Sequence, residues 1–591
     1  MATLPLVDVL IVGMGVAGGI IANELAKRSP GLKIVALERG PYRATWPDFI
    51  QDHFDEWRFG VQSELHQNLA NVTVTFRNKD AQSARPMRQY GAFKPGNGVG
   101  GAAVHWNGVS WRYLPYFFEY RTHLETRYGK TFLPEDTTIQ DWGVSYEELE
   151  PFYTQYEQTF GIAGKAGNLN GALQPGGNPF EGPRSTEYPQ PPVTIAYGPT
   201  LFRDGAAKVG HQPFPQPSAN SPARYTNPDG QTLGACNYCG FCAGYGCHAG
   251  AKASPMTTVI PSALATGRVE IRQLSNAFRI DHDGKKATGV SYYDASGQEQ
   301  TQTADLVVLS AWTLENTRLL LLSGIGEAYD PAAGTGNVGR NYTYQTGAVV
   351  GGAIANVWWE DKLTNRFMGS GSNGYAIDEF NSDNFDHKDL DFFGGGSIAC
   401  NNPGSAPILG SGPLPPGSPR WGAGWKQAVH DWYNRSAFFT MQGESPAYRQ
   451  NYMDLDPTYR DAWGNPLLRI TFNWTDNERK MVRYIADNVL QPIADAMAPT
   501  HKDVRGDLPD FDITPYQSTH VQGGTIMGTS PETSVVNSHG QVWGLPNLFV
   551  AGGSTFPQNA GYNPTGTVGA LAYRTADAIA SRWLKDGGML G

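Results

Sequence analysis

Four of the five cysteines of the chain fall within 12 residues. They are Cys236, Cys239, Cys242 and Cys247, with two residues between each of the first three and four residues before the last. Loops this short close poorly as a set of disulfides. Thiolates at these spacings converge readily on a metal centre, and the intervening glycines supply the turns. The pattern favours an iron–sulfur cluster; a structural zinc ion and disulfides are the alternatives.

A second group of chemically capable residues lies between Gly96 and Arg112. Four glycines in six positions, the last two being Gly100 and Gly101, let the backbone approach something flat or anionic. His105 follows them, between a valine and a tryptophan. A polar ring in apolar surroundings needs a partner, so it is either a core histidine bonded to a backbone carbonyl or a functional group.

A histidine and an asparagine in the last quarter of the chain suit proton transfer. His520 stands in the run Thr-His-Val-Gln-Gly-Gly, and Asn563 directly precedes Pro564 at the expected start of the last helix. A histidine base with an asparagine as hydrogen-bond partner suits removal of a hydroxyl proton during hydride transfer. The simpler alternatives are a structural histidine and a helix N-cap.

A dinucleotide-binding βαβ unit at the N-terminus would position part of this chemistry. The apolar run at 7–12 predicts a strand, helical spacing continues to Lys27, and a second strand at 32–37 ends in Glu38. Three glycines lie between the first strand and the helix: Gly13, Gly15 and Gly18. Such a turn approaches a pyrophosphate closely, and the acid takes ribose hydroxyls. The motif alone does not choose between FAD and NAD.

Further strands are predicted to return to the same sheet, at 269–274, 277–280, 287–293 and 305–310, followed by a helix to residue 322. A strand at 547–553 ends in a glycine pair that includes Gly553, and the last helix is predicted at 568–583. Strands at 348–358 and 468–474, with a long helix at 476–497, indicate a second domain that caps the first.

Size and composition exclude several classes of protein. With 591 residues, 17% of them charged, the chain is too long for one simple domain and too apolar for a disordered protein. The net charge of −10 and the lack of a basic patch exclude a nucleic-acid partner. No apolar run of transmembrane length and no export signal are visible in this sequence, so we expect membrane contact only through a partner.

Taken together, these motifs resemble the glucose–methanol–choline (GMC) oxidoreductases over nearly the whole chain. The resemblance rests on the N-terminal glycines with Glu38, on Gly100-Gly101, on 313–326 with 338–341, and on the tail from His520 through Asn563-Pro564-Thr565. It implies an α/β fold in which a Rossmann-like FAD-binding domain (1–115, 230–345, 530–591) is interleaved with an α+β substrate-binding domain and its lid loops (116–229, 346–529).

The same resemblance implies the roles of individual residues. His520 and Asn563 match the catalytic pair. The residues that match the FAD contacts are Gly13, Gly15, Gly18, Glu38, Gly100, Gly101, His105, Asn107, Gly553, Asn563 and Thr565. The run around His105 is similar to a segment in which a histidine is joined covalently to the flavin 8α-methyl group.

The cysteine run narrows the resemblance to bacterial membrane-associated sugar and sugar-acid dehydrogenases, most closely the gluconate 2-dehydrogenase group. This implies oxidation of a secondary hydroxyl, D-gluconate to 2-dehydro-D-gluconate first, with glucose, sorbitol, fructose or glycosides as alternative substrates. It also implies an iron–sulfur cluster, 3Fe–4S in preference to 4Fe–4S, on cysteines among the four. The expected partners are a small signal-bearing subunit and a multihaem cytochrome c subunit, on the periplasmic side of the bacterial inner membrane.

Three other functions stay open at this point. They are a flavin oxidase that makes hydrogen peroxide and carries a structural zinc, a non-catalytic electron-relay subunit, and a nicotinamide dehydrogenase. A substrate carboxylate would also need a cation. Arg112, Lys252 and Arg366 are of the right kind, although each is expected to be an ordinary solvated surface charge.

Overall fold

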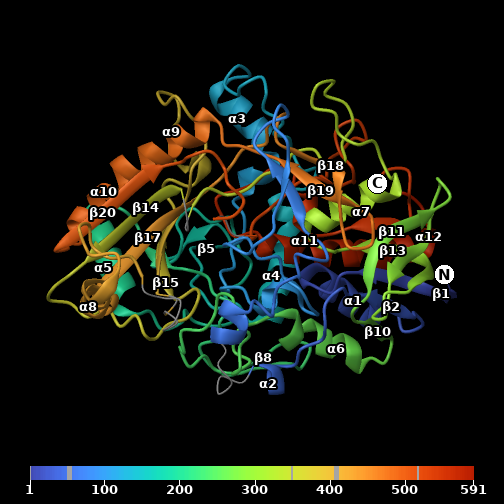
Figure 1. The fold of residues 1–591 in the computed structure, drawn as a ribbon, viewed down its shortest axis with the longest axis horizontal. Helices are drawn as coiled ribbons and strands as arrows, with labels where there is room; N and C mark the ends of the chain where they lie inside the picture. Colours follow the sequence, from blue (N-terminus) through green and yellow to red (C-terminus); the bar gives the residue numbers. More distant parts are fainter. Residues whose placement is uncertain (1, 50–55, 348–350, 403, 405–411, 516–517) are drawn as a thin grey trace.

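The computed structural model describes the whole chain except residues 1, 50–55, 348–350, 403, 405–411 and 516–517. Two large sheets lie side by side (Figure 1). The first is built from N-terminal residues, residues 269–309 and one C-terminal strand, and the second mainly from the third quarter of the chain. Both termini lie at the outer side of the first sheet (Figure 1).

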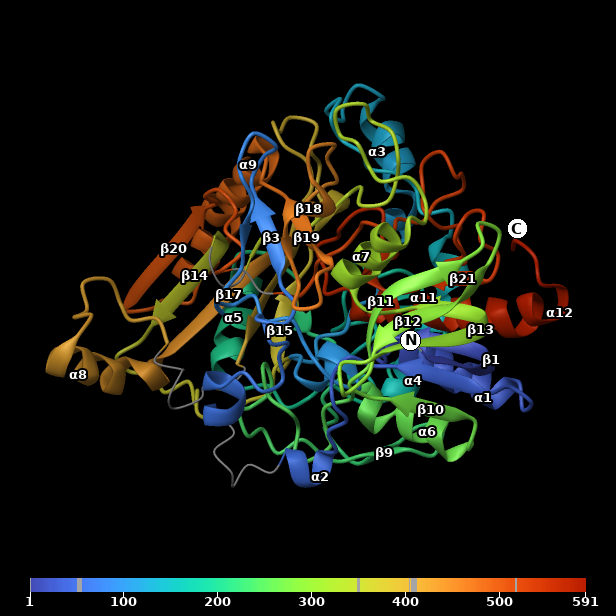
Figure 2. The same ribbon diagram turned by 45° about the vertical axis from the view of Figure 1, so that its right-hand side comes forward.

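The first sheet has seven strands, ordered β10-β2-β1-β13-β12-β11, and β21 also pairs with β13. Its parallel strands are β1 (Ala2–Val12), β2 (Ile34–Leu37), β10 (Val269–Arg272), β13 (Glu299–Leu309) and β21 (Leu548–Val550). The antiparallel strands β12 (Ala287–Tyr293) and β11 (Asn276–His282) extend one edge. Figure 2 brings this sheet forward. Strand β1 is a continuous apolar run from residue 9 because both faces of a parallel sheet are covered.

Helices cover both faces of the first sheet. α1 (Val16–Arg28) packs with α6 (Val259–Ala265) and α11 (Thr565–Ala578), and α4 (Tyr146–Phe160) lies on α11. Val9 and Ile11 point into this helical layer. Leu10 and Val12 point into the opposite layer, which contains Leu319 of α7 (Thr313–Ser323). The alternation along β1 therefore divides the core into two halves.

The second sheet is antiparallel, in the order β20-β14-β17-β16-β15-β7. Its strands are β20 (His501–Asp507), β14 (Gly352–Trp358), β17 (Ser436–Gly443), β16 (Gly396–Asn401), β15 (Gly374–Ile377) and β7 (Phe214–Pro215). One face packs on α5 (Tyr197–Lys208), α9 (Asp476–Ile485) and α10 (Gln491–Ala496). A capping box between Thr475 and Glu478 begins α9.

A third, four-stranded sheet connects the two. It contains β18 (Tyr452–Arg460), β19 (Pro466–Thr471), β3 (Val74–Arg77) and β4 (Arg85–Pro86), and β18 and β19 pack on α7. The remaining longer helices are α3 (Tyr120–Tyr128) and α8 (Gly422–Trp432); short elements are α2 (Thr45–Asp48), α12 (Leu584–Asp586), the pair β5 (Asn168–Leu169) and β6 (Ala172–Leu173), and the pair β8 (Tyr225–Thr226) and β9 (Thr232–Leu233). The division of the chain into two domains stays a prediction.

Several predicted elements differ from the structure in their bounds. The last helix, predicted at 568–583, is α11 (Thr565–Ala578) followed by a π-helical turn, Ile579–Trp583. The single helix predicted at 476–497 is interrupted by a π-helical turn, Ala486–Leu490, between α9 and α10. Pro492 follows this turn and lacks an N–H for a regular helical bond, so the widened turn accommodates it. The strand predicted at 348–358 appears as β14 from Gly352, and its residues 348–350 lie outside the described residues.

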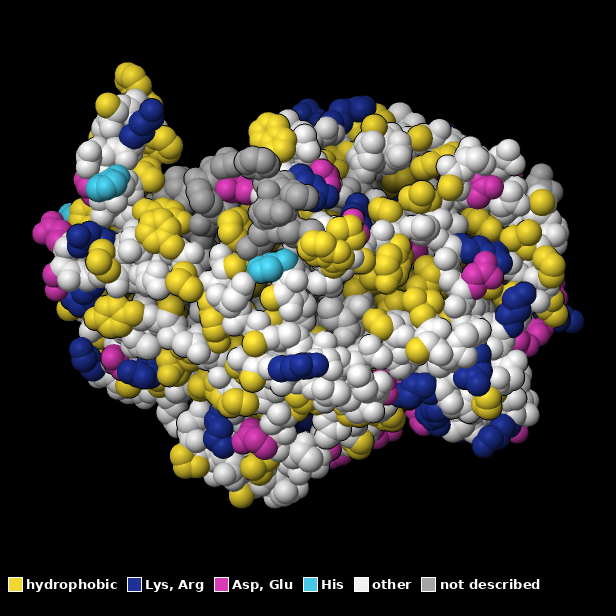
Figure 3. Space-filling view, turned by 90° about the horizontal axis from the view of Figure 1, so that it is seen from below, with side chains coloured by type: hydrophobic (Ala, Val, Ile, Leu, Met, Phe, Trp, Pro, Cys, Tyr) yellow, Lys and Arg dark blue, Asp and Glu magenta, His cyan; other side chains and the backbone are white. Residues whose placement is uncertain are grey.

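The surface carries many apolar side chains on the side where α2 and α6 lie, as Figure 3 shows. Among large hydrophobic residues, Trp46 is 73% exposed and Trp57 is 51% exposed. In the part of the chain that the structure describes, no helix is long and apolar enough to cross a bilayer.

Candidate active site

The turn between β1 and α1 contains Gly13, Gly15 and Gly18, and at Gly13 and Gly18 it is packed too closely for a side chain. A β-carbon on Gly18 would lie 2.1 Å from the carbonyl oxygen of Gly13. Glu38 follows β2 and is buried; its carboxylate accepts the backbone N–H of Met14 at 3.0 Å and that of Gly40 at 2.8 Å. Burial raises the pKa of Glu38 above its usual value. The acid is thus fixed at the carboxyl end of β2, beside the glycine turn.

The second glycine run packs directly against the first. The N–H of Gly100 donates to the carbonyl of Met14 at 2.8 Å. A β-carbon on Gly101 would lie 2.9 Å from the Cα of Gly15, and Gly101 has a left-handed φ of +61°. The two loops therefore form one continuous glycine-lined wall, which fits the pyrophosphate of a dinucleotide at the N-terminus of α1. These residues fit FAD, although their contacts with it stay predictions.

His105 follows this wall at the end of a short 3₁₀ turn. Its Nε2 atom is buried and has no hydrogen-bond partner within the described chain. Its ring centre lies 4.8 Å from that of His66, and burial lowers the pKa of His105 well below its usual value. The simple alternative, a core histidine satisfied by a backbone carbonyl, does not account for this bare nitrogen. Nearby, Asn107 uses its Oδ1 to accept the N–H of Val109 at 3.2 Å.

The four clustered cysteines are free thiols in one loop. Burial raises the pKa of Cys236 to about 12 and that of Cys242 to about 11, so both are protonated at neutral pH in the absence of a metal. Among the described residues, no three histidine, cysteine or acidic side chains converge closely enough to hold a metal ion. Four cysteines are a donor set of the kind that binds a metal centre through thiolates. In the structure their side chains do not converge on one point.

A buried lysine joins the cysteine loop to the segment that contains His105. Lys252 is 2% exposed, and its Nζ donates to the carbonyls of Cys242 and Tyr245, each at 2.8 Å, and of Trp106 at 2.9 Å. The N–H of Gly244 donates to the carbonyl of His105 at 2.7 Å. The loop is therefore fastened beside the glycine wall.

Gly369, from the loop before β15, holds the other side of the cysteine loop. The backbone N–H of Gly240 donates to Gly369 at 3.0 Å, and the N–H of Gly369 donates to Tyr238 at 2.9 Å. Residues 45–49 cover a further side of the cysteine loop. The ring of Phe49 packs directly on Gly246, where an added β-carbon would lie only 2.0 Å from it.

His520 and Asn563, 43 positions apart, meet in the structure. The Asn563 Nδ2 donates to the His520 Nε2 at 2.9 Å, and the Oδ1 of Asn563 is buried without a partner in the described part of the chain. His520 has a left-handed φ of +65°, which is strained for a residue with a side chain. Burial lowers the pKa of His520 to about 4. The ring is therefore neutral at physiological pH and can accept a proton.

The remaining predicted cofactor residues lie next to this pair. The carbonyl of Gly553 accepts the N–H of Gly523, three residues past His520, at 3.1 Å. Thr565 is the first residue of α11. A β-carbon on Gly566 would lie 2.1 Å from the carbonyl of Trp111, so the start of α11 abuts the segment that leaves the glycine wall.

The expectation of surface charge was wrong for the three candidate cations, because all are buried. Arg112 forms ion pairs with Glu157 at 2.8 Å and Glu150 at 3.0 Å. Lys252 is held by the three carbonyls described above. Arg366 donates to the hydroxyl of Ser436 at 3.0 Å. Arg112 and Lys252 are therefore occupied within the fold.

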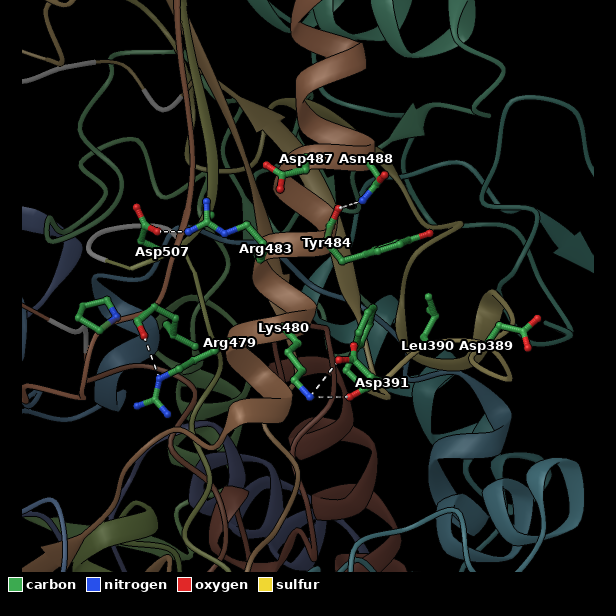
Figure 4. A pocket seen from close by; sticks show the side chains of 14 residues that line it. Asp389, Leu390, Asp391, Arg479, Lys480, Arg483, Tyr484, Asp487, Asn488 and Asp507 are labelled. Atoms are coloured by element: carbon green, nitrogen blue, oxygen red, sulfur yellow. Dashed lines mark hydrogen bonds and ion pairs between the residues drawn. The ribbon is translucent and has the colours of Figure 1, made fainter.

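A cavity of about 890 Å³ lies elsewhere, beside α9 and β20 (Figure 4). Its charged side chains pair with acids: Lys480 with Asp391 at 3.0 Å, and Arg483 with Asp507. None of its lining residues belongs to the glycine wall or to the His520–Asn563 pair.

Comparison with known proteins identifies the family. The two GMC oxidoreductase models match residues 223–346 and 447–572. The chain is 44% identical over 592 aligned residues to the gluconate 2-dehydrogenase flavoprotein of Pantoea cypripedii, covering 99% of this chain and 95% of that protein. The chain belongs to the GMC oxidoreductase family. The resemblance stated from the sequence is thus confirmed, and so is the use of FAD as cofactor by an alcohol oxidoreductase.

Other GMC relatives and structures agree. The fructose dehydrogenase large subunit of Gluconobacter japonicus is 27% identical, with 97% of each chain covered. Pyridoxine 4-oxidase from Mesorbium loti has a TM-score of 0.60 at 16% identity, with 98% of this chain and 99% of that chain covered. A formate oxidase from Aspergillus oryzae has a TM-score of 0.56 at 13% identity, with 99% of each covered. These structures confirm the mixed α/β GMC fold.

Sequence reasoning missed two sets of residues beside the site. Lys252 was predicted to be either a substrate ligand or a surface charge, although its position five residues after Cys247 could have indicated a contact with the loop. The second set is Asp378 and Tyr562, which share a hydrogen bond. Tyr562 directly precedes Asn563, but no sequence pattern pointed to its contact with Asp378.

Proposed function

We propose that the protein is an FAD-dependent dehydrogenase that oxidises a secondary hydroxyl of a sugar acid or sugar, with conversion of D-gluconate to 2-dehydro-D-gluconate as the first candidate. The observation that carries the proposal is the contact between His520 and Asn563. It occurs in a chain that is 44% identical to a gluconate 2-dehydrogenase flavoprotein. Glucose, sorbitol, fructose and glycosides are the alternative substrates in the same family.

The chemistry assigned to the pair follows from its protonation state. Neutral His520 takes the proton of the substrate hydroxyl at Nε2, and the amide of Asn563 holds the substrate oxygen. FAD, when bound, supplies the acceptor for the hydride at N5. After the transfer, protonated His520 stabilises the carbonyl product through its positive charge. In the free site the Asn563 amide occupies the Nε2 lone pair, so a substrate hydroxyl must displace or share that bond.

The FAD contacts would come from both glycine loops. The turn at Gly13, Gly15 and Gly18 and the opposed pair Gly100-Gly101 would hold the pyrophosphate. Glu38 would take ribose hydroxyls. Asn107, Gly553 and Thr565 complete the predicted contacts. The bare Nε2 of buried His105 supports a covalent bond to the flavin 8α-methyl group.

The cysteine loop is proposed to hold an iron–sulfur cluster, 3Fe–4S in preference to 4Fe–4S. The support is the set of four free thiols at Cys236, Cys239, Cys242 and Cys247, fastened by Lys252 beside the His105 segment. Such a cluster exchanges single electrons, whereas hydride transfer delivers two.

A multihaem cytochrome c subunit is proposed as the electron acceptor, and a small signal-bearing subunit as the partner for export to the periplasmic side of the bacterial inner membrane. Fructose dehydrogenase, one of the relatives, is described as a large subunit, which implies an assembly in that case. Exposed Trp46 lies in the segment that covers the cysteine loop and supports a protein contact there.

The first experiment is an anaerobic visible spectrum before and after addition of D-gluconate. Bleaching of the flavin band supports the sugar-acid function. Bleaching with glucose or sorbitol alone retains the mechanism and replaces the substrate. No bleaching with any sugar or sugar acid contradicts the proposal and favours a relay subunit. Hydrogen peroxide formed stoichiometrically in air would identify an oxidase.

Metal analysis of the same sample tests the cysteine loop. Iron with acid-labile sulfide supports the cluster. One zinc ion per chain, with no sulfide, would replace it by a structural metal site.

A further inference from the structure

The segment that carries Asn563 is held by the second sheet and its neighbouring loops. Gln345 donates from Nε2 to the carbonyls of residues 560 and 562, and the Ser397 hydroxyl donates to the carbonyl of residue 561 at 2.9 Å. Ser397 belongs to β16. The backbone leading to Asn563 is therefore fixed by residues 345 and 397, and not only by the helix that follows.

A buried carboxylate completes this support. Asp378 directly follows β15 and has no exposed surface. It accepts hydrogen bonds from the hydroxyl of Tyr562, from the Asn178 amide at 2.9 Å and from the Asn381 amide at 3.0 Å. Burial raises the pKa of Asp378 to about 6, and the three donors oppose that shift. The carboxylate is therefore ionised at neutral pH, where its bonds are strongest.

Tyr562 transmits this support to the next residue. Its ring is buried and stacks on Trp111, with ring centres 4.7 Å apart and planes 17° apart. Tyr562 is thus held both at its ring and at its hydroxyl, and Asn563 is the next residue of the chain. The Asn563 amide then reaches His520 at 2.9 Å.

We propose that Asp378 is a positioning residue for the reaction: through Tyr562 it sets the place of the Asn563 amide relative to His520. Asp378 has no direct contact with either member of the pair among the described residues, so its effect is on geometry. The proposal rests on the proposed function of that pair. A small displacement of a hydrogen-bonding group at a reacting centre lowers the rate more than it lowers binding.

A neighbouring network supplies a matched control. The hydroxyl of Tyr128 donates to buried Asp383 at 2.6 Å, which is the same kind of bond. Within the described chain, the hydrogen bonds of Asp383 go to His123, Arg127, Tyr128, His387 and Tyr116, and none goes to residues 560–563. Tyr128→Phe therefore removes an equivalent bond from the turn that follows Asn381, and Tyr128 itself forms no hydrogen bond with residues 560–563 in the described chain.

The test compares Tyr562→Phe, Asp378→Asn and Tyr128→Phe as FAD-loaded proteins. Tyr562→Phe retains the ring stack and deletes only the hydroxyl. Anaerobic stopped-flow reduction by D-gluconate gives the limiting rate of flavin reduction and the apparent Kd. We expect the first two variants to lose roughly tenfold or more in rate with Kd changed by less than about threefold, and Tyr128→Phe to stay within about twofold of the wild type.

Three outcomes would overturn the proposal. They are an unchanged rate in Tyr562→Phe, an effect on Kd alone, and an equal loss in Tyr128→Phe, which would indicate a general loss of packing. FAD content and Tm establish that each variant is folded. If Asp378→Asn does not fold, Tyr562→Phe alone decides.

A second measurement needs no substrate, so it tests the positioning role independently of the proposed function. If no sugar reduces the wild-type flavin, the proposed function is wrong, but this measurement can still be made. The ¹⁵N resonances of the His520 ring, assigned with His520→Gln, report its bond to Asn563. We expect Tyr562→Phe to shift the Nε2 resonance and Tyr128→Phe to leave it in place. An unshifted resonance in Tyr562→Phe contradicts the positioning role.

Discussion

The amide nitrogen of Asn563 lies 2.9 Å from Nε2 of His520 and donates a hydrogen bond to it. Since an amide NH₂ group cannot accept, Nε2 is unprotonated and the ring proton is on Nδ1. Burial lowers the pKa of His520 to about 4, so this neutral form persists at physiological pH. The relationship assigns the proton-accepting atom and leads to the first prediction.

His520→Ala should lower the rate of flavin reduction by about a hundredfold or more, because a positioned base contributes this much. FAD should remain bound, since its contacts lie mainly on the glycine loops. His430→Ala is the control, because that side chain is 82% exposed. Stopped-flow reduction with the candidate sugars measures the effect. An unchanged rate in His520→Ala would remove this residue from the mechanism.

Gly101→Ala should abolish stable FAD binding, because the new β-carbon would stand 2.9 Å from the Cα of Gly15. Gly171→Ala is the matched control: its φ is +87°, yet nothing lies within 4 Å of the added carbon. Backbone strain of about 1–2 kcal/mol is common to both. Flavin retained after gel filtration is the readout. Equal retention in the two variants would show that crowding of the wall is unimportant.

A covalent bond at His105 should keep flavin fluorescence with the denatured chain on an SDS gel. His105→Gln should release the flavin on denaturation, and His66→Gln should not, although the two rings lie 4.8 Å apart. Flavin released from the denatured wild-type protein would show that the bond is absent.

Lys252→Met should lower both Tm and iron content. The substitution leaves the carbonyls of Trp106 and Tyr245 without a donor, each at a cost of about 1–3 kcal/mol, whereas the carbonyl of Cys242 keeps the N–H of Tyr245. We expect Tm to fall by about 3 °C or more. Lys426→Met, at an exposed position, is the control. Thermal unfolding and iron analysis decide the matter. A normal Tm would mean that the cysteine loop does not depend on this lysine.

Stability should fall as pH is lowered from about 6.5 towards 4, and His539 should contribute to the fall. Burial first, then Arg574 and Arg582, lower the pKa of His539 to about 4. Between its unfolded and folded pKa values, the unfolded chain binds a proton that the folded chain does not, so acid favours unfolding. His539→Gln should reduce the difference in Tm between pH 7 and pH 5, and exposed His430→Gln should not. An unchanged difference in His539→Gln would contradict the assignment.

Much of the first sheet could be predicted from local patterns. The run at 7–12, the glycine turn and Glu38 are adjacent in the chain, so their relation follows from strand and helix geometry alone. The strand predicted at 287–293 is observed with the same bounds as β12. The helix at 476–497 was predicted as one continuous helix, because a proline such as Pro492 does not by itself predict a π-helical turn before it.

The sequence by itself determined the βαβ unit, the glycine runs, the cysteine spacing and the family. Only the tertiary structure decided that the Gly15 and Gly101 backbones touch, that Lys252 is buried against three carbonyls, and that Asp378 supports Tyr562 behind Asn563. The physical reason is that local motifs are specified by neighbours along the chain. These contacts instead join segments far apart in sequence, and their partners are set by how whole sheets and loops pack.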